Sequence, residues 1–178
     1  LGYCCRRRRG LGQSLISRFS SEGMQAVGLG RTAPKESVGH FLQVDFADVE
    51  DTSSKLNDLT AEYGPPQIVV HNAAELVIAP FTGTTLQDYQ RCWTSMVQSL
   101  VILGQCVLQP MVRGGGTLIV SGATASLRGG AKFSAFASAK FALRGLTQSL
   151  AREYQPAGIH VAHVILDGII DTPRSREL

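Results

Sequence analysis

The sequence lacks long apolar runs, a secretory leader and a surplus of charge, and each absence excludes a class of protein. None of its 178 residues belongs to an apolar stretch of the roughly 20 residues that a membrane span requires. Its first residues, LGYCCRRRRGLG, contain no apolar segment of the kind found in signal peptides. We therefore expect a cytoplasmic protein with no membrane partner.

Cysteine is scarce as well, and the four cysteines are not spaced as metal ligands usually are. Cys4, Cys5, Cys92 and Cys106 form no CxxC pair, and no histidine cluster accompanies them. This pattern favours a reduced intracellular chain and predicts no metal site. The net charge is only +3, and because the run 6–9, four arginines, contributes +4, the rest of the chain nets −1. Because the basic character is confined to one run, we expect no nucleic-acid partner.

What the sequence does contain is an alternation of short apolar runs and helical patterns. With 44% apolar residues, the chain can bury the core of one domain over 1–178. This alternation predicts an α/β fold, a Rossmann-like doubly wound parallel sheet with helices on both faces. The expected strands are 1–5, 24–30, 40–46, 66–73, 117–122 and 159–166, and the expected helices are 12–23, 48–64, 86–112 and 133–155.

In such a sheet the ligand lies outside the carboxyl ends of the strands, so the residues that follow each strand are candidates for binding. Gly10 and Gly12 open the first helix, where backbone amides and the positive helix end would meet a pyrophosphate. Arginines favour phosphate, and we include Arg9 and Leu11 among the coenzyme contacts. The alternative is an ordinary strand-to-helix turn beside a solvated basic loop.

Further candidates follow the next strands. Arg31 stands where an NAD-binding fold usually has a carboxylate, and it suits a 2′-phosphate, so NADP(H) is favoured over NAD(H). The carboxylate of Asp45, beside Phe46, either accepts from an adenine amino group or caps a helix, although Asp48 already suits the cap. After the fourth strand, Asn72 is followed by the small residues Ala73 and Ala74, which either admit a ligand or pack a tight crossover.

The segment SAFASAKFALRG, residues 134–145, places Phe136 and Lys140 on one helix face. A lysine among Phe, Ala and Ser must lose water or find a polar partner, unless it extends to the surface.

Together these segments resemble the short-chain dehydrogenases/reductases. CRRRRGLG (5–12), HNAA (71–74), FASAK (136–140) and DGIIDT (167–172) stand where that family has TGxxxGxG, NNAG, YxxxK and PGxVxT. The resemblance implies a small-molecule substrate, a lysine on the nicotinamide ribose, and a chain incomplete at both ends. It also implies a homodimer or homotetramer through helices 86–112 and 133–155. The residues assigned from it are Lys140 for the ribose, and Gly168, Ile170 and Thr172 as coenzyme contacts; Leu100, Val101, Phe141 and Leu143 are expected to be exposed for subunit contact.

The sequence departs from the family pattern at the residues that would carry catalysis. Phe136 takes the place of the tyrosine and has no exchangeable proton. Ala123 falls on the serine, Met96 on the helical asparagine and Ala74 on the last NNAG glycine. The hydroxyl of Thr124 is the best placed substitute, and Ser126 and a water on Lys140 are further possibilities. Arg6 also replaces the first glycine of the phosphate loop.

Two main functions remain open at this point, beside a lesser one in which the chain is a scaffold that binds no nucleotide because Arg6 blocks the pocket. The first is an NADP(H)-dependent oxidoreductase that acts on a small alcohol, carbonyl or enone with a non-standard proton donor, Lys140, Phe136 and Thr124 forming the catalytic positions. The alternative is a catalytically silent NADP(H)-binding sensor or assembly subunit.

Overall fold

The computed structural model describes residues 2–5, 10–33, 39–168 and 170 of the chain. Six strands form one sheet in the order β3-β2-β1-β4-β5-β6, and every neighbouring pair is parallel. The predicted doubly wound α/β fold is confirmed. The strands are β1 (Gly2–Cys5), β2 (Ala26–Gly30), β3 (His40–Gln43), β4 (Ile68–His71), β5 (Gly116–Ala123) and β6 (Ile159–Leu166).

The helices lie close to their predicted ranges, with one addition. A π-helical turn, η2, separates α3 from α4, so the expected helix 86–112 carries an extra residue in its middle. The α-helices are α1 (Leu11–Ser21), α2 (Val49–Tyr63), α3 (Leu86–Trp93), α4 (Ser99–Met111) and α5 (Ser134–Tyr154); the short turns are η1 (Phe81–Gly83), η2 (Thr94–Gln98), η3 (Thr124–Ser126) and η4 (Gln155–Ala157).

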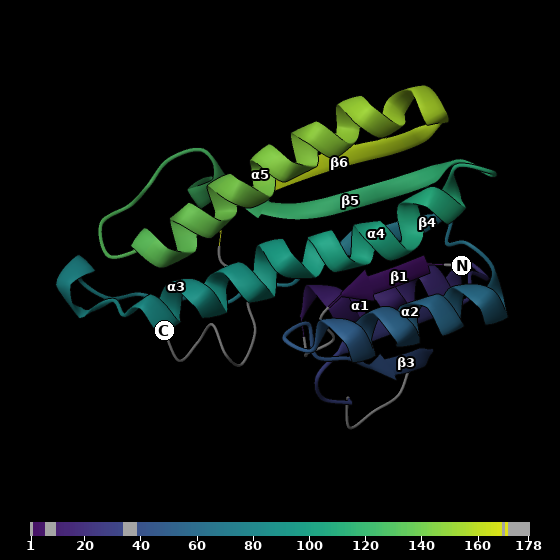
Figure 1. Ribbon diagram of the computed structural model, residues 1–178, viewed down its shortest axis with the longest axis horizontal. Helices are drawn as coiled ribbons and strands as arrows, with labels where there is room; N and C mark the ends of the chain where they lie inside the picture. Colours follow the sequence, from purple (N-terminus) through teal and green to yellow (C-terminus); the bar gives the residue numbers. More distant parts are fainter. Residues whose placement is uncertain (1, 6–9, 34–38, 169, 171–178) are drawn as a thin grey trace.

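The sheet is covered unequally on its two faces. α1 packs on β1 and β2, where Ile16, Ala26 and Val70 form a small core. α2, α4 and α5 lie on the opposite face, over a much larger core, and Figure 1 shows α5 running along β5 and β6. That core includes Leu56, Met96, Leu103, Leu118 and Val120.

Two residues expected at the surface belong to this core. Leu100 and Leu143 are fully buried, whereas Val101 and Phe141 are exposed. The expectation was wrong for the leucines because successive helix positions turn by about 100°, so neighbouring residues in the sequence occupy different faces.

Because the strands are parallel, their carboxyl ends lie along one edge of the sheet, on the left of Figure 1. The chain winds from β1 to β2 and β3 on one side, and from β4 to β6 on the other. The change of direction falls between β1 and β4, where folds of this topology have their ligand crevice. Among the described helices, none is long and apolar enough to cross a membrane.

Candidate functional site

The first helix begins directly at this edge. Gly10 is its N-terminal cap and has φ +142°, a conformation that favours glycine. No side chain caps this end, and the first turn contains no acidic residue. The amides of Leu11 and buried Gly12 therefore open a helix end suited to an anion. Arg9 lies outside the described residues.

The ends of β2 and β3 lie next to each other. Arg31 follows β2 with an exposed side chain, and its carbonyl accepts a hydrogen bond from Gln43 Nε2 at 3.1 Å. Asp45 and Phe46 follow β3 and are not part of it, so the predicted strand 40–46 was too long. The Asp45 carboxylate accepts from the Ala47 amide at 3.1 Å and does not cap α2. The α2 cap is Asp48, as predicted.

Phe46 contacts the π-helical turn η2 and the main core. Its carbonyl accepts from Gln98 Nε2 at 2.7 Å, and its ring packs on the main core. Gln98 is the last residue of the π turn, so this turn is joined to the end of β3. Met96, which falls on the family's asparagine position, is fully buried in the same turn. The side chain at that position is thus part of the hydrophobic core.

A buried histidine ends β4, immediately before Asn72. His71 Nε2 and Ser99 Oγ lie 2.7 Å apart, and Ser99 Oγ donates to the Ser95 carbonyl at 2.7 Å. Because the serine proton is already given to Ser95, His71 carries its proton on Nε2. Its Nδ1 has no hydrogen-bond partner among the described residues. Burial, followed by the nearby charge of Lys140, lowers the pKa of His71 to about 3.

The residues after His71 leave the sheet at the same edge. Ala73 is buried, while Asn72 and Ala74 are half-buried. All three lie just beyond the carboxyl end of β4, at the edge where the other candidate residues are found. Sequence reasoning passed over His71, although a polar residue at the end of an apolar strand was a usable signal.

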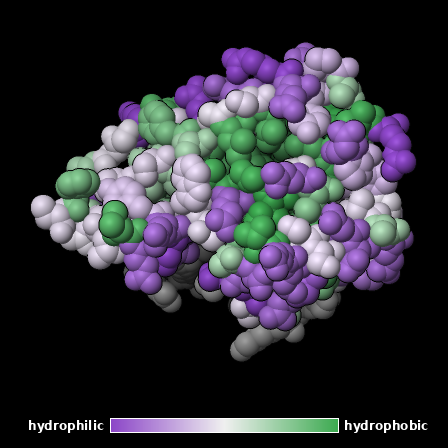
Figure 2. Space-filling view, viewed as in Figure 1, coloured by the Kyte–Doolittle hydropathy of each residue, from purple (hydrophilic) through white to green (hydrophobic). Residues whose placement is uncertain are grey.

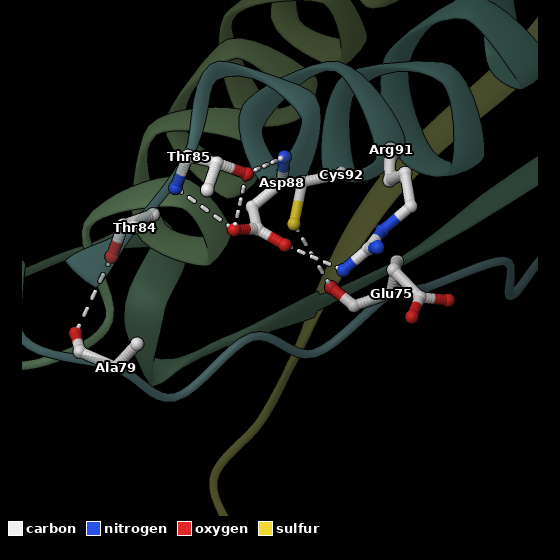
Figure 3. A network of polar contacts seen from close by, with 7 residues as sticks. All are labelled: Glu75, Ala79, Thr84, Thr85, Asp88, Arg91 and Cys92. Carbon is white, nitrogen blue, oxygen red and sulfur yellow. Dashed lines mark hydrogen bonds and ion pairs between the residues drawn. The ribbon is translucent and has the colours of Figure 1, made fainter.

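The loop that follows is fixed on α3 by the polar network in Figure 3. Thr85 and Asp88 form a reciprocal capping box at the start of α3, and Arg91 pairs with Asp88 at 2.5 Å. Cys92 Sγ donates to the Glu75 carbonyl at 3.4 Å. The loop also reaches the start of α5, because the Ala79 amide donates to the Lys132 carbonyl at 2.9 Å. These bonds hold two loops together beside the strand ends.

The predicted pair on α5 has the expected desolvated setting. Lys140 is only 3% exposed, and its Nζ donates to the Ser121 carbonyl of β5 at 2.8 Å. The same ammonium lies 5.7 Å from the centre of the Phe136 ring, within cation–π range. The alternative of a lysine extended to the surface is wrong.

Thr124 has a partner that sequence reasoning did not anticipate. Its Oγ1 donates a hydrogen bond to Asp167 Oδ1, and the carboxylate itself is exposed. Gly168 follows with φ +152°, and Ile170 is exposed. Thr172 lies outside the described residues. The threonine and aspartate sit at the ends of β5 and β6, at the edge that also carries Lys140.

A second histidine supports the turn that contains Thr124. His163 of β6 has Nε2 at 3.2 Å from Ser126 Oγ and Nδ1 at 3.4 Å from Thr147 Oγ1. The Ser126 hydroxyl also accepts from the Ala123 amide at 3.1 Å. Burial, followed by the charges of Lys140 and Arg144, lowers the pKa of His163. The neutral imidazole of His163 therefore connects β6 to Ser126 of η3 and to Thr147 of α5.

Comparison of the sequence with known protein families agrees with this arrangement of strands, helices and candidate residues. The family profile described as short chain dehydrogenase matches residues 7–178. The chain belongs to the short-chain dehydrogenase family. This dehydrogenase is 28% identical to the L-xylulose reductase of Bos taurus over 174 residues, which cover 93% of this chain and 69% of the reductase.

Solved structures extend the likeness. A short-chain dehydrogenase of Rhodopseudomonas palustris is 30% identical with a TM-score of 0.81, over 98% of this chain and 87% of that one. A 4-hydroxyisoleucine dehydrogenase complexed with NADH and succinate shares the fold, with 18% identity and a TM-score of 0.87 over 94% of this chain and 79% of that one. As a short-chain dehydrogenase, the protein belongs to a class of oxidoreductases that act on alcohol and carbonyl groups.

Proposed function

We propose that this short-chain dehydrogenase is an NADP(H)-dependent oxidoreductase that acts on a small alcohol, carbonyl or enone with a non-standard proton donor. The observation that carries the proposal is the buried Lys140 ammonium, which is held by the Ser121 carbonyl at the carboxyl end of β5. A buried ammonium is costly unless it is bonded, so its placement at the ligand edge of the sheet favours a binding role.

The remaining residues fit a dinucleotide. The uncapped end of α1, at Gly10, Leu11 and Gly12, suits the pyrophosphate, and exposed Arg31 suits a 2′-phosphate. We assign the adenine side to Asp45 and Phe46. The other assignments are Asn72, Ala73 and Ala74 beside the crevice, Lys140 on the nicotinamide ribose, and Arg9, Gly168, Ile170 and Thr172 as further contacts.

The coenzyme supplies a hydride acceptor or donor when it is bound, and the chain must manage the proton. Phe136 cannot do so, because its ring carries no exchangeable proton. Losing one positioned acid or base removes about 10²–10⁴ in rate, so a hydroxyl such as that of Thr124 would have to replace it. Lys140 keeps its position without the phenol, since its bond is made to the β5 backbone.

Calorimetric titration with NADP⁺ and NAD⁺ tests the coenzyme assignment. We expect NADP⁺ to bind about tenfold or more tightly, since a charge-assisted bond from Arg31 to phosphate contributes at least that ratio. Arg31→Ala should remove the preference, whereas Arg113→Ala, which deletes an exposed arginine in the turn after α4, should keep it. If neither coenzyme binds, the proposal is wrong.

Turnover separates the enzyme from a silent binding protein. NADPH oxidation is to be followed over a panel of carbonyl compounds, sugars and enones, with Phe136→Tyr beside the unaltered chain. Coenzyme binding without turnover in either protein would favour the silent sensor or assembly subunit.

Members of this family are commonly oligomeric, and we propose a homodimer or homotetramer through α3, α4 and α5. Figure 2 shows apolar surface gathered over the middle of the face where α4 and α5 lie. Trp93, Val101 and Phe141 are exposed on these helices. Light scattering on a size-exclusion column measures the mass directly, and a monomer at micromolar concentration would contradict the proposal.

A further inference from the structure

The sheet register brings one hydroxyl and one carboxylate together at the ligand edge. Ala123 and Leu166 are the last paired residues of β5 and β6. Thr124 and Asp167 therefore leave the sheet side by side, and the Thr124 hydroxyl donates to the Asp167 carboxylate. The threonine is half-buried and the aspartate exposed, so the pair is open to the solvent side where a substrate would enter.

The position of Thr124 is fixed on both sides by α5. Lys140 Nζ bonds the carbonyl of Ser121, three residues before the threonine. Arg144 Nη1 bonds the carbonyl of Ser126, two residues after it, at 3.4 Å. A hydroxyl held between two anchored backbone groups is preorganised for a ligand.

The neighbouring hydroxyl groups are less suitable. Ser126 is fully buried, accepts from the Ala123 amide and contacts His163. Ser138 donates to the Ala135 carbonyl of its own helix. Thr124 is thus distinguished from Ser126 by its partial exposure, and from both serines by its carboxylate partner.

We propose that Thr124 and Asp167 form the proton path that replaces the missing phenol, and that they act in the direction of alcohol oxidation. The inference rests on the proposed function. Thr124 Oγ accepts the proton of the substrate hydroxyl as its O–H bond breaks, and passes its own proton to Asp167 Oδ1. The carbinol carbon loses a hydride, with two electrons, to an oxidised nicotinamide coenzyme, and a carbonyl group forms. An ionised carboxylate is a proton acceptor, which favours oxidation over reduction.

In this assignment Thr124 contacts the reacting oxygen, and Asp167 is a positioning residue that acts through it. The pair can be tested without a known substrate by using 2,2,2-trifluoroethanol, an alcohol that resists oxidation. Fluorine NMR follows its binding to the protein saturated with NADP⁺. We expect Thr124→Val and Asp167→Asn each to weaken this binding about tenfold or more, because each removes a hydrogen bond assisted by a charge.

Conservative and distant variants separate this effect from damage to the fold. Thr124→Ser keeps the hydroxyl and should bind trifluoroethanol within about threefold of the unaltered protein. Thr60→Val and Asp58→Asn remove the same groups from α2, the first a hydroxyl bonded to the Leu56 carbonyl, and should leave binding unchanged. All variants should keep their affinity for NADP⁺.

Rescue by the conservative variant adds a measurement that a structural role would not move. For any secondary alcohol that turns over, Asp167→Asn should lower kcat about tenfold or more, whereas Asp167→Glu keeps a carboxylate and should keep kcat within about threefold. Lys140, Arg144 and His163 are packed beside the pair, and all three are retained in these variants.

The outcomes are distinct. Equal trifluoroethanol binding by the unaltered protein and Thr124→Val overturns this inference alone, and so does an NADP⁺ complex that does not bind trifluoroethanol at all. Failure to bind NADP⁺ or NAD⁺ overturns the proposed function, and this inference with it. Weaker binding in both pair variants, with NADP⁺ affinity intact and Thr124→Ser close to normal, supports the pair.

Discussion

The buried histidine at the end of β4 should make the stability of the fold depend on pH. His71 is fully buried and bonded to Ser99, and its pKa falls from 6.5 to about 3, chiefly through burial. Between these two values the unfolded chain binds a proton at His71 and the folded chain does not. The free energy of unfolding must therefore decrease as the pH falls from about 6.5 towards about 3.

The size of the effect follows from the same two values. Where only the unfolded chain is protonated, each pH unit changes the free energy of unfolding by about 1.4 kcal/mol. From about pH 8 to about pH 5 the loss due to His71 is about 2 kcal/mol, because the dependence begins only near the unfolded pKa. Replacing His71 by Asn should remove this part of the pH dependence, although the smaller side chain lowers stability at every pH.

Urea unfolding at a series of pH values, followed by circular dichroism, measures the difference. The curve for His71→Asn should be flatter than that of the unaltered protein by about 2 kcal/mol over this range. Val69→Ala is the matched control, because it removes buried methyl groups from the same strand without changing a titratable group. Parallel curves for the unaltered protein and His71→Asn would show that the buried imidazole does not govern acid stability.

Three further predictions concern single side chains. Phe136→Tyr should leave turnover within about tenfold in a steady-state assay, because on our proposal Thr124 and Asp167 already carry the proton; a rise of about 10²-fold or more would mean that the unaltered chain has no working proton path. Phe141→Glu should lower the mass seen by light scattering to that of a monomer, whereas the same mass would place the subunit contact on another face. Cys92 should resist iodoacetamide in the native protein and react in urea, because burial raises its pKa to about 11; peptide mass spectrometry that finds native labelling would contradict this.

The order of strands and helices was predictable because each element has a recognisable hydrophobic pattern within its own stretch of the sequence. Apolar runs separated by helical patterns predicted every described strand and α-helix, and Asp48 marked the start of α2 correctly. Strand ends were less predictable. The run 40–46 contains the apolar residues Val44 and Phe46 after Gln43, which suggested a longer strand. The strand ends at Gln43, although the Val44 amide still donates to the Gly30 carbonyl of β2. The Asp45 carboxylate then accepts from the Ala47 amide, and the chain turns away.

The site was predictable only where a residue type was unusual for its surroundings. Lys140 stood out among small and apolar residues, and its burial is confirmed. Asp167 and His163 did not stand out, because their partners are distant in the sequence. The bond from Thr124 to Asp167 spans 43 residues and exists because β5 and β6 pair in one particular register. No local pattern contains that register.

The absence of a phenol at position 136 of α5 is a smaller change to the structure than to the chemistry. Phe136 packs against the main core, and its ring faces the Lys140 ammonium. A buried ammonium needs partners, and the Ser121 carbonyl together with the ring supplies them. On our proposal, the charge that would bind the coenzyme ribose therefore stays in place although Phe136 has no proton to donate. On our proposal, binding and proton transfer are separated, with the first on α5 and the second between the ends of β5 and β6. A variant that harms one should then leave the other intact, which a site built on a single tyrosine and lysine pair would not allow.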